Sequence, residues 1–302
     1  MSCCAKRKAI AVAWLMLLLT GVQAEEVGAR WGTEQREREY YRVVSVPIPK
    51  GQVIESGAFE LMPDNRMAIG TRRGDIYFMS GVDDDKPHPR FEKFAEGLDE
   101  IFGLAHRKGE KDALYVTHSA ELTRVRDTNG DGRADRFETV SDAWGYRNYH
   151  EYAFGSKFDA QGNLYVALGL SASYHSRALF RGWAMKITPE GKSIPIASGL
   201  RSPGGIGPNE HGALFYIESQ GPWNSSCSLK FLKPGGFMGH PVSFNWYPYA
   251  PGLKRPAAPE SGTRIVTEKE KVKELVPYAV VFPYIRMGRS ITGYVVDKTG
   301  GK

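Results

Sequence analysis

Residues 199–241 read GLRSPGGIGPNEHGALFYIESQGPWNSSCSLKFLKPGGFMGHP. An Arg-Ser-Pro-Gly-Gly turn precedes an aromatic-rich apolar run. A Gln-Gly-Pro corner separates this run from a second apolar run, which ends in a Gly-Gly-Phe-Met-Gly-His-Pro exit. Short apolar and aromatic runs favour strands, whereas glycine and proline mark the turns between them. The stretch therefore predicts two short strands bounded by turns.

The same plan recurs along the chain. Four apolar strand cores begin 47, 50 and 50 residues apart, and each follows a polar or glycine-containing turn. The cores are residues 67–69 (MAI), 114–116 (LYV), 164–166 (LYV) and 214–216 (LFY). A period of about 50 residues with several short strands per repeat is typical of propeller blades, and no long amphipathic helix pattern competes with it.

We therefore predict an all-β fold, a β-propeller of four-stranded blades. Four repeats are visible, and residues 290–296 (SITGYVV) begin a fifth shortly before the sequence ends at Lys302. A propeller closes its ring to protect its sheet edges. Our interpretation is a truncated chain, with residues 25–302 as the N-terminal part of one propeller domain; the alternative is a complete small propeller.

The first 24 residues have the three-part layout of a secretory signal peptide. A basic cluster at 6–8 precedes an apolar run at 9–19, and small or polar residues lead to Ala24, where we expect cleavage. The apolar run is shorter than the roughly 20 residues that span a bilayer. We expect no membrane span after cleavage and a mature protein that is periplasmic or secreted.

Composition narrows the range of partners. Cleavage would remove three basic residues and lower the formal net charge from +6 to +3. No basic stripe with interleaved aromatic residues follows, so we predict no nucleic-acid partner. Of the three cysteines only Cys227 would remain, which leaves the mature chain without an internal disulfide.

Residues 127–138 (DTNGDGRADRFE) match the twelve-position calcium-loop pattern. The predicted ligands are the side chains of Asp127, Asn129, Asp131, Asp135 and Glu138 and the backbone carbonyl of Arg133. Strand-like residues flank the loop, so we expect it to close a hairpin and to hold calcium in a structural role. The alternative is an acidic turn that binds no metal.

Three further positions are candidates for chemistry. His150 lies in the aromatic segment 144–152 and could act as a general base, or it could be a packed histidine. Arg201 could bind a carboxylate or quinone oxygen with its planar fork, or it could be a surface charge. The corner 220–222 could offer backbone carbonyls to a cation.

From about Phe59 onward, and most densely over 149–241, the sequence resembles the soluble quinoprotein glucose and sorbosone dehydrogenase-like propellers. It is more similar still to propeller domains of large secreted bacterial proteins that are labelled membrane-bound dehydrogenases. The matching motifs are 199–203 (GLRSP), 218–222 (ESQGP) and 233–241 (KPGGFMGHP), together with His150 ahead of 162–166 (GNLYV).

The resemblance implies a six-bladed propeller that oxidises a sugar, or a related alcohol or aldehyde, with pyrroloquinoline quinone (PQQ). It implies that His150 is the base and that Arg201 contacts the quinone. The corner Gln220, Gly221 and Pro222 would bind the cofactor, the last two through a calcium ion. A c-type cytochrome is the implied electron acceptor.

This sequence departs from the family pattern at positions expected in the cofactor pocket. Ser202 replaces an asparagine, Gly169-Leu170 replaces Gly-Asp, and 224–227 (NSSC) replaces acidic residues. Two functions therefore stay open: the PQQ-dependent sugar dehydrogenase, and a non-catalytic propeller that binds carbohydrate or protein and carries a structural calcium ion.

Overall fold

The computed structural model describes residues 36, 38–40, 42–82, 86–171, 175–284, 287 and 290–296. The signal peptide predicted at 1–24 lies outside the described residues. Residues Ser45–Lys298 form one compact unit, which contains all the named strands. Among the described residues no helix is both long and apolar enough to cross a membrane.

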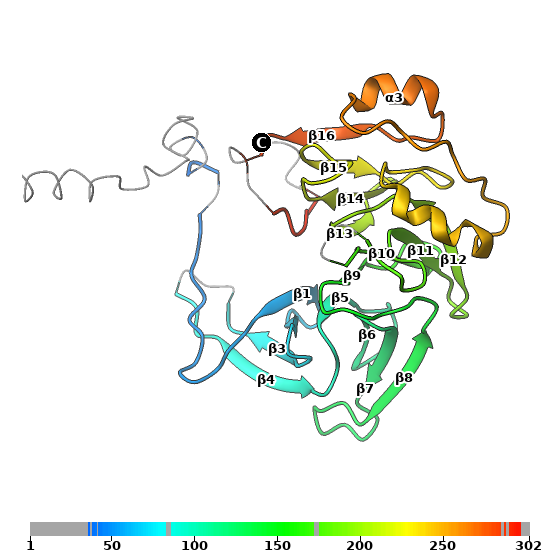
Figure 1. Ribbon diagram of the computed structural model, residues 1–302. Helices are drawn as coiled ribbons and strands as arrows, with labels where there is room; N and C mark the ends of the chain where they lie inside the picture. The colour runs from blue at the N-terminus through cyan, green and yellow to red at the C-terminus, as the bar shows by residue number, and fades with distance from the viewer. Residues whose placement is uncertain are drawn as a thin grey trace, which may run out of the picture. The chain divides into compact units, whose positions relative to one another are not determined.

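The compact unit is built from four antiparallel sheets of four strands each, in chain order (Figure 1). Blade 1 contains β1 (Ser56–Leu61), β2 (Met67–Thr71), β3 (Ile76–Ser80) and β4 (Arg90–Ala95). Blade 2 contains β5 (Ile101–Ala105), β6 (Ala113–His118), β7 (Leu122–Arg126) and β8 (Arg136–Ser141). Blade 3 contains β9 (Ala153–Gly155), β10 (Leu164–Leu168), β11 (Trp183–Ile187) and β12 (Ser193–Ser198). Blade 4 contains β13 (Pro203–Pro208), β14 (Leu214–Glu218), β15 (Cys227–Phe231) and β16 (Tyr278–Phe282).

The predicted all-β propeller is confirmed, and its period has a simple structural meaning. The four repeated cores lie in β2, β6, β10 and β14, the second strand of each blade. These strands lie inside their sheets, with a strand on either side, and are mostly buried. Every residue of β6 and β10 is buried. Because both faces are covered, their sequences are continuous apolar runs rather than alternating ones.

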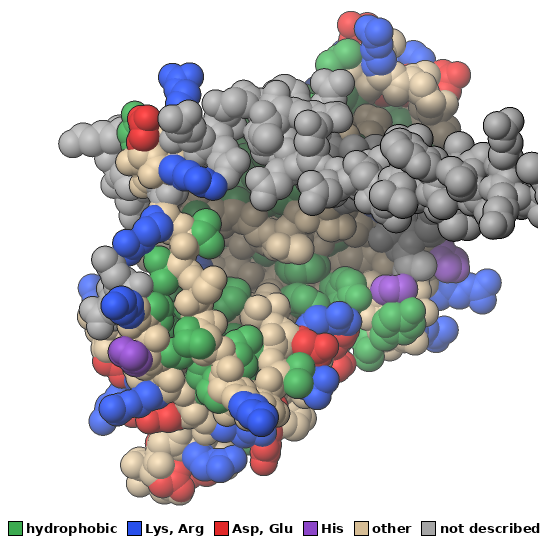
Figure 2. Space-filling view, turned by 90° about the vertical axis from the view of Figure 1, so that its left-hand side faces the viewer, with side chains coloured by type: hydrophobic (Ala, Val, Ile, Leu, Met, Phe, Trp, Pro, Cys, Tyr) green, Lys and Arg blue, Asp and Glu red, His purple; other side chains and the backbone are tan. Residues whose placement is uncertain are grey.

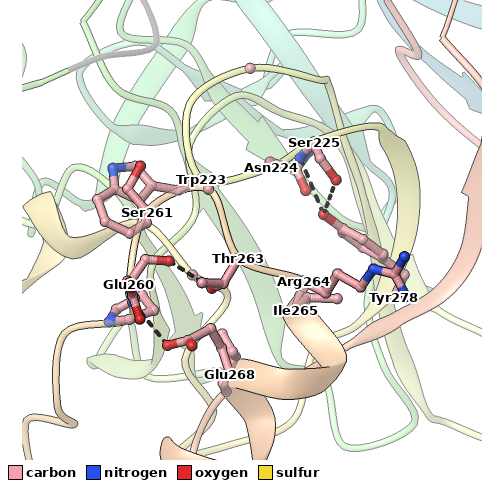
Figure 3. A pocket seen from close by; sticks show the side chains of 15 residues that line it. Trp223, Asn224, Ser225, Glu260, Ser261, Thr263, Arg264, Ile265, Glu268 and Tyr278 are labelled. Atoms are coloured by element: carbon pink, nitrogen blue, oxygen red, sulfur yellow. Dashed lines mark hydrogen bonds between the residues drawn. The ribbon is translucent and has the colours of Figure 1, made fainter.

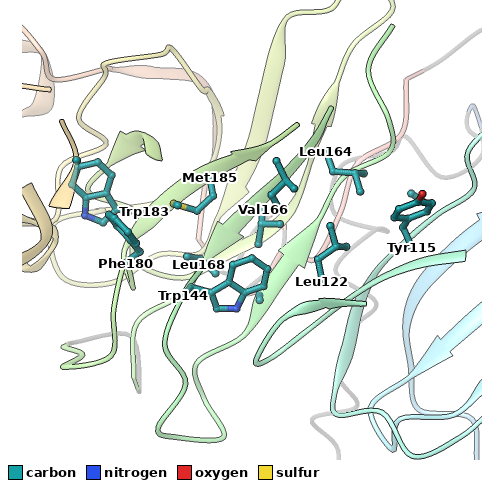
Figure 4. Close-up of a cluster of buried hydrophobic side chains, with 13 residues drawn as sticks. Tyr115, Leu122, Trp144, Leu164, Val166, Leu168, Phe180, Trp183 and Met185 are labelled. Carbon is teal, nitrogen blue, oxygen red and sulfur yellow. The ribbon is translucent and has the colours of Figure 1, made fainter. Parts of the chain in front are cut away.

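The core lies between the blades. One cluster joins Tyr115 and Leu122 of blade 2 to Leu164, Val166 and Trp183 of blade 3 (Figure 4). The indole of Trp183 is fully buried and donates a hydrogen bond to the carbonyl of Ser243, 2.9 Å away. Fully burying one large apolar side chain contributes about 1.5–3 kcal/mol. Adjacent blades are therefore held together by packing.

One detail of the sequence interpretation is wrong: residues 203–208 form strand β13, not part of a turn. This strand contains three glycines because it is an inner strand, packed closely on its neighbours. A Cβ on Gly204 would lie 2.6 Å from the carbonyl oxygen of Ile291. Inner strands β5 and β9 show the same relation, since a Cβ on Gly103 would lie 2.6 Å from the Cα of Gly155. Glycine here permits close approach.

Residues 291–296 lie along β13. The hydroxyl of Tyr294 donates to the carbonyls of Gly207 and Phe215, at 2.5 and 3.2 Å. An inner strand of a further blade would occupy this position beside β13. The placement agrees with the predicted start of a fifth blade, and the predicted truncation stays a prediction.

The inner strands and residues 292–296 surround a central hollow of about 760 Å³. Figure 2 views the side of the molecule on which β1 lies, and apolar side chains gather on that face. Phe59 and Leu61 of β1 are 52% and 61% exposed. Exposed apolar patches of this kind are typical of surfaces that other structure covers.

The side chain of Arg181 connects blades 2 and 3. Its guanidinium is fully buried and donates to three carbonyl oxygens, those of Gly145, Tyr152 and Ser119, at 2.8, 2.9 and 2.7 Å. Burial lowers the pKa of Arg181 to about 10, so the side chain remains charged at neutral pH. Buried cations are tolerated where hydrogen bonds satisfy them in this way.

Within the described residues of the compact unit 45–298, the helices lie in the connection between β15 and β16. It contains the 3-10 helix η1 (Pro241–Tyr249) and the short helix α3 (Ile265–Lys271) (Figure 1). The sequence pattern of residues 266–275 is compatible with a loop or a short helix. In the structure, α3 covers most of this stretch.

Candidate functional site

His150 and Arg201 come together at one end of the inner strands. His150 precedes β9 and Arg201 precedes β13, so the propeller geometry brings both loops to the same end of the blades. The two residues line a cavity of about 40 Å³. The remaining lining residues are Tyr152, Phe154, Gly169, Leu170, Ser202 and Pro203. The structure thus brings together the two residues predicted to be catalytic.

The imidazole of His150 is partly exposed and lies against aromatic rings. Its ring centre is 4.1 Å from that of Tyr149 and 6.2 Å from that of Tyr152. The next residue, Glu151, is buried, and its carboxylate accepts from the backbone N–H of Arg147 at 2.7 Å and from the hydroxyl of Ser176 at 2.5 Å. Glu151 thereby fixes the loop that carries His150.

Arg201 is buried and its guanidinium is held by backbone oxygens. Nη1 donates to the carbonyls of Ser219 and Gln220, at 3.0 and 2.8 Å. The guanidinium lies in the space that a Cβ on Gly221 would occupy. Only glycine at position 221 leaves this space open.

A buried acidic group supports the backbone of the same loop. Oε1 of Glu218 accepts from the backbone N–H groups of Arg201 and Ser202, at 3.0 and 2.6 Å. Its Oε2 accepts from the hydroxyl of Tyr216 at 2.6 Å, and Nζ of Lys230 lies 3.9 Å from it. The carboxylate thus fixes the turn from which Arg201 extends.

Burial and these contacts shift the pKa values of Tyr216, Lys230 and His240. Burial, with the adjacent Glu218 carboxylate, raises the pKa of Tyr216 well above its ordinary value. Burial lowers the pKa of Lys230. Burial, together with the positive charge of Arg201, lowers the pKa of His240 to about 4. His240 is therefore neutral at physiological pH, which agrees with its Nδ1 accepting from the N–H of Val242.

The corner 220–222 was predicted to offer carbonyls to a calcium ion that binds PQQ. In the structure the carbonyl of Gln220 accepts from Arg201. The carbonyl of Gly221 accepts from the backbone N–H of Asn224 at 3.0 Å. The cavity beside Arg201 has about 40 Å³, whereas ligand pockets usually have about 300–1,000 Å³. As arranged, these residues do not fit PQQ with its calcium ion.

The predicted calcium loop lies at the hairpin between β7 and β8, as expected. Its side chains cap its own backbone: Asp127 accepts from the N–H groups of Gly130 and Gly132, at 2.7 and 2.8 Å, and Asp131 accepts from that of Arg133 at 2.8 Å. Asn129 accepts from the N–H of Asp131, and Asp135 accepts from Thr128. These four side chains therefore belong to one curled loop.

Glu138 behaves differently from the other predicted ligands. Its carboxylate pairs with the guanidinium groups of Arg126 and Arg136, at 2.9 and 3.0 Å. Among the described residues no group of three or more His, Cys, Asp or Glu side chains is arranged to hold a metal ion. Calcium binding at this loop therefore stays a prediction, and in this geometry Glu138 is not among the available ligands.

The sequence interpretation missed an ion pair near His150. Arg72 and Glu100 are bonded through Nη2 and Oε1 at 2.5 Å, and the Arg72 guanidinium carbon lies 5.8 Å from the ring centre of Tyr152. Tyr152 in turn lines the His150–Arg201 cavity. These residues come from three separate loops, so no local pattern could have joined them.

Four antiparallel sheets follow one another along the chain, and each contributes its own inner strand. This arrangement defines the class of the protein as a β-propeller. Residues 52–247 match the sequence profile of a family described as a domain of unknown function, DUF7133. Since the match spans more than half of the chain, the protein belongs to this family. A search of the curated proteins by sequence found no match.

Solved structures with the same fold include sugar dehydrogenases. The PQQ domain of pyranose dehydrogenase from Coprinopsis cinerea is 10% identical with a TM-score of 0.52; the match covers 66% of this chain and 59% of that domain. A carbohydrate-active enzyme of family AA12 from Trichoderma reesei is 12% identical with a TM-score of 0.51, covering 67% and 62% of the two chains. An aldose sugar dehydrogenase from Streptomyces coelicolor, solved with PQQ bound, is 18% identical with a TM-score of 0.48, covering 66% and 65%.

The first two of these comparisons confirm the expected resemblance at the level of the fold. The chain spans less than two thirds of the length of each of these three proteins. Their activities therefore describe those proteins alone.

Proposed function

We propose that the protein is an exported, dehydrogenase-like propeller that recognises a hydroxyl group of a sugar or glycan at the His150–Arg201 cavity. The observation that carries the proposal is the convergence of these two side chains, from separate blades, on one cavity. The cavity, of about 40 Å³, exceeds the roughly 10–15 Å³ that a cavity needs to hold one water molecule. A sugar hydroxyl is of similar size and can both donate and accept a hydrogen bond.

Each residue has a distinct part in this recognition. A ring nitrogen of His150 accepts a hydrogen bond from the sugar hydroxyl. The rings of Tyr149 and Tyr152 offer apolar surface to the sugar ring. Arg201, fixed by the carbonyls of Ser219 and Gln220, contributes a positive potential that favours the hydroxyl oxygen.

Oxidation of the bound sugar is the second candidate function. The pairing of a potential base with an arginine at one cavity favours it. For this reaction the family resemblance implies PQQ as the cofactor, which would supply the oxidising group, and a c-type cytochrome as the electron acceptor. Because the corner residues do not fit that cofactor as arranged, we derive no catalytic step through it.

The experiment compares binding with turnover in the purified protein. Sugar binding is measured by calorimetry for the wild type, for His150→Ala, and for His211→Ala as a control. His211 is 79% exposed in the turn between β13 and β14. We expect at least a tenfold loss of affinity in His150→Ala alone. Unchanged affinity in that variant would overturn the proposal.

A second measurement separates the two candidate functions. The wild type is supplied with PQQ and calcium, and dye reduction by an aldose is followed alongside equilibrium titration of the quinone. Dye reduction that requires both additions supports oxidation. If the protein binds sugar but does not bind the quinone, the result supports sugar recognition without oxidation.

A further inference from the structure

A second cavity lies directly beside the His150–Arg201 cavity. Its volume is about 250 Å³, far more than the roughly 10–15 Å³ that one water molecule needs. The same two segments of the chain bound both cavities. In one segment His150 lines the first cavity and Glu151 the second, and in the other Leu170 lines the first. The next residue, Ser171, lines the second. Consecutive Cα atoms are about 3.8 Å apart, so the two cavities are close enough for one sugar unit to contact both.

Two arginine side chains line this second cavity. Arg147 lies in the segment before β9, and Arg177 lies in the connection between β10 and β11. Both residues are exposed, so their guanidinium groups are accessible to a ligand. No carboxylate of the described residues forms an ion pair with either of them. Each guanidinium therefore keeps its planar set of N–H donors for a partner outside the chain.

Among the described lining residues, Glu151 carries the only carboxylate, and that carboxylate is already engaged. Glu151 is 1% exposed. Its Oε2 accepts from the backbone N–H of Arg147, and its Oε1 accepts from the hydroxyl of Ser176. Burial lowers the pKa of Arg181, and the Glu151 carboxylate opposes this decrease because the two charges attract each other. With two exposed arginines against one buried carboxylate, the lining is net positive, and Arg181 adds to that charge.

Asn148 offers a further donor at the same cavity. Its Oδ1 accepts from the backbone N–H of His150 at 3.0 Å, so the amide oxygen is used to hold the loop that carries His150. The Nδ2 group has two N–H donors. Within the described part of the chain, neither of them is used in a hydrogen bond. The cavity therefore combines positive charge with free donors, as an oxyanion requires.

The larger pocket on blade 4 does not share this excess of positive charge (Figure 3). Its volume is about 400 Å³, and the carboxylates of Glu260 and Glu268 line it together with the guanidinium of Arg264. Lys271 pairs with both carboxylates, at 3.4 and 3.0 Å, so these four charges balance. Of the two pockets, the cavity beside His150 is the one whose charges favour an anion.

We propose that this second cavity binds an anionic substituent, a carboxylate or a sulfate ester, of the sugar that the protein recognises, which rests on the function proposed above and narrows its ligand to an acidic sugar. The sugar hydroxyl lies at the His150–Arg201 cavity, and the anionic group contacts the guanidiniums of Arg147 and Arg177. Paired N–H donors of guanidinium match the oxygens of carboxylate and phosphate, and a sulfate ester has the tetrahedral shape of a phosphate. The Nδ2 group of Asn148 donates to a remaining oxygen.

The test compares three sugars that differ only at carbon 6. Glucose carries a CH₂OH group there, glucuronate a carboxylate, and glucose 6-sulfate a sulfate ester. Calorimetric titration of the wild type should show one of the two acidic sugars binding about tenfold or more tightly than glucose, which identifies the substituent. Replacing both arginines, Arg147→Gln with Arg177→Gln, should reduce that affinity to the affinity for glucose and leave glucose binding unchanged.

Arg73→Gln is the matched control, because it removes the same charge from an exposed position. Arg73 lies between β2 and β3, pairs with Glu55 at 3.1 Å and does not line the cavity. We expect the acidic sugar to bind this variant as it binds the wild type. A loss equal to that of the double variant would assign the preference to overall charge and contradict a specific site.

His150→Ala distinguishes the acidic-sugar site from the function on which it rests. This variant should bind all three sugars more weakly. If every affinity stays unchanged in it while the double variant still loses the acidic sugar, the proposed function fails and the anion site stands. Equal affinity of the wild type for the three sugars, unchanged acidic-sugar affinity in the double variant, or no acidic-sugar binding up to about 10 mM would each overturn the anion site. Glucose binding that depends on His150 would leave the proposed function intact in each of these cases.

Discussion

Arg201 occupies the space beside Gly221 that a Cβ on that residue would need. The contact joins the loop before β13 to the corner after β14, and it lets the guanidinium reach the carbonyls of Ser219 and Gln220. The glycine of the Gln-Gly-Pro corner thus has a steric role in this protein, independent of any bound ion.

Gly221→Ala should displace the guanidinium and lower the free energy of unfolding by about 2–4 kcal/mol, because a buried cation loses two acceptors. Urea unfolding measures the effect. In an Arg201→Met background the same substitution should cost much less. Gly293→Ala is the control, since a Cβ there meets nothing within 4 Å. If Gly221→Ala lowers the free energy of unfolding equally in both backgrounds, its effect does not depend on Arg201.

His240 should make stability depend on pH. Its pKa is about 4 in the folded protein, because of burial and Arg201, and about 6.5 when unfolded. Between these values the unfolded chain binds more protons, so stability falls as pH decreases from 6.5 to 4. The loss should be about 3 kcal/mol.

His240→Asn keeps an acceptor for the N–H of Val242 and removes the titration. Unfolding free energies at pH 7 and pH 4.5 should therefore differ less in this variant than in the wild type. An unchanged difference would assign the acid sensitivity to other groups.

Calcium binding at the loop 127–138 should not require Glu138, because Arg126 and Arg136 already pair with that carboxylate. We expect calcium to raise the melting temperature of the wild type and of Glu138→Gln, and to have no effect on Asp131→Asn. Asp142→Asn, an exposed position outside the loop, is the control. If chelator leaves the wild-type melting curve unchanged, the loop is only a turn.

Much of the fold could be predicted from the sequence. The cores at 67–69, 114–116, 164–166 and 214–216 all lie in second strands, because these strands are buried on both faces and leave continuous apolar runs. Inner strands are harder to recognise. Close packing replaces their side chains with glycine, so the stretch PGGIGP at 203–208 has the composition of a turn.

The site could be predicted only in part. His150 and Arg201 each precede an inner strand, and a family motif marks that place in the sequence. The hydrogen-bond partners were not predictable: nothing local indicates that Arg201 binds the carbonyls 18 and 19 residues ahead, or that Arg72 and Glu100 pair across 28 residues. Such partners depend on the register of separate blades.

The buried contact between Arg181 and Ser119 also has a kinetic consequence. The two residues are 62 positions apart, so the hydrogen bond forms only after a long loop has closed. Contacts of such separation slow folding, and the guanidinium stays solvated until they form. Blades 2 and 3 should therefore become a single cooperative unit late on the folding pathway, once the chain through Arg181 has left the ribosome.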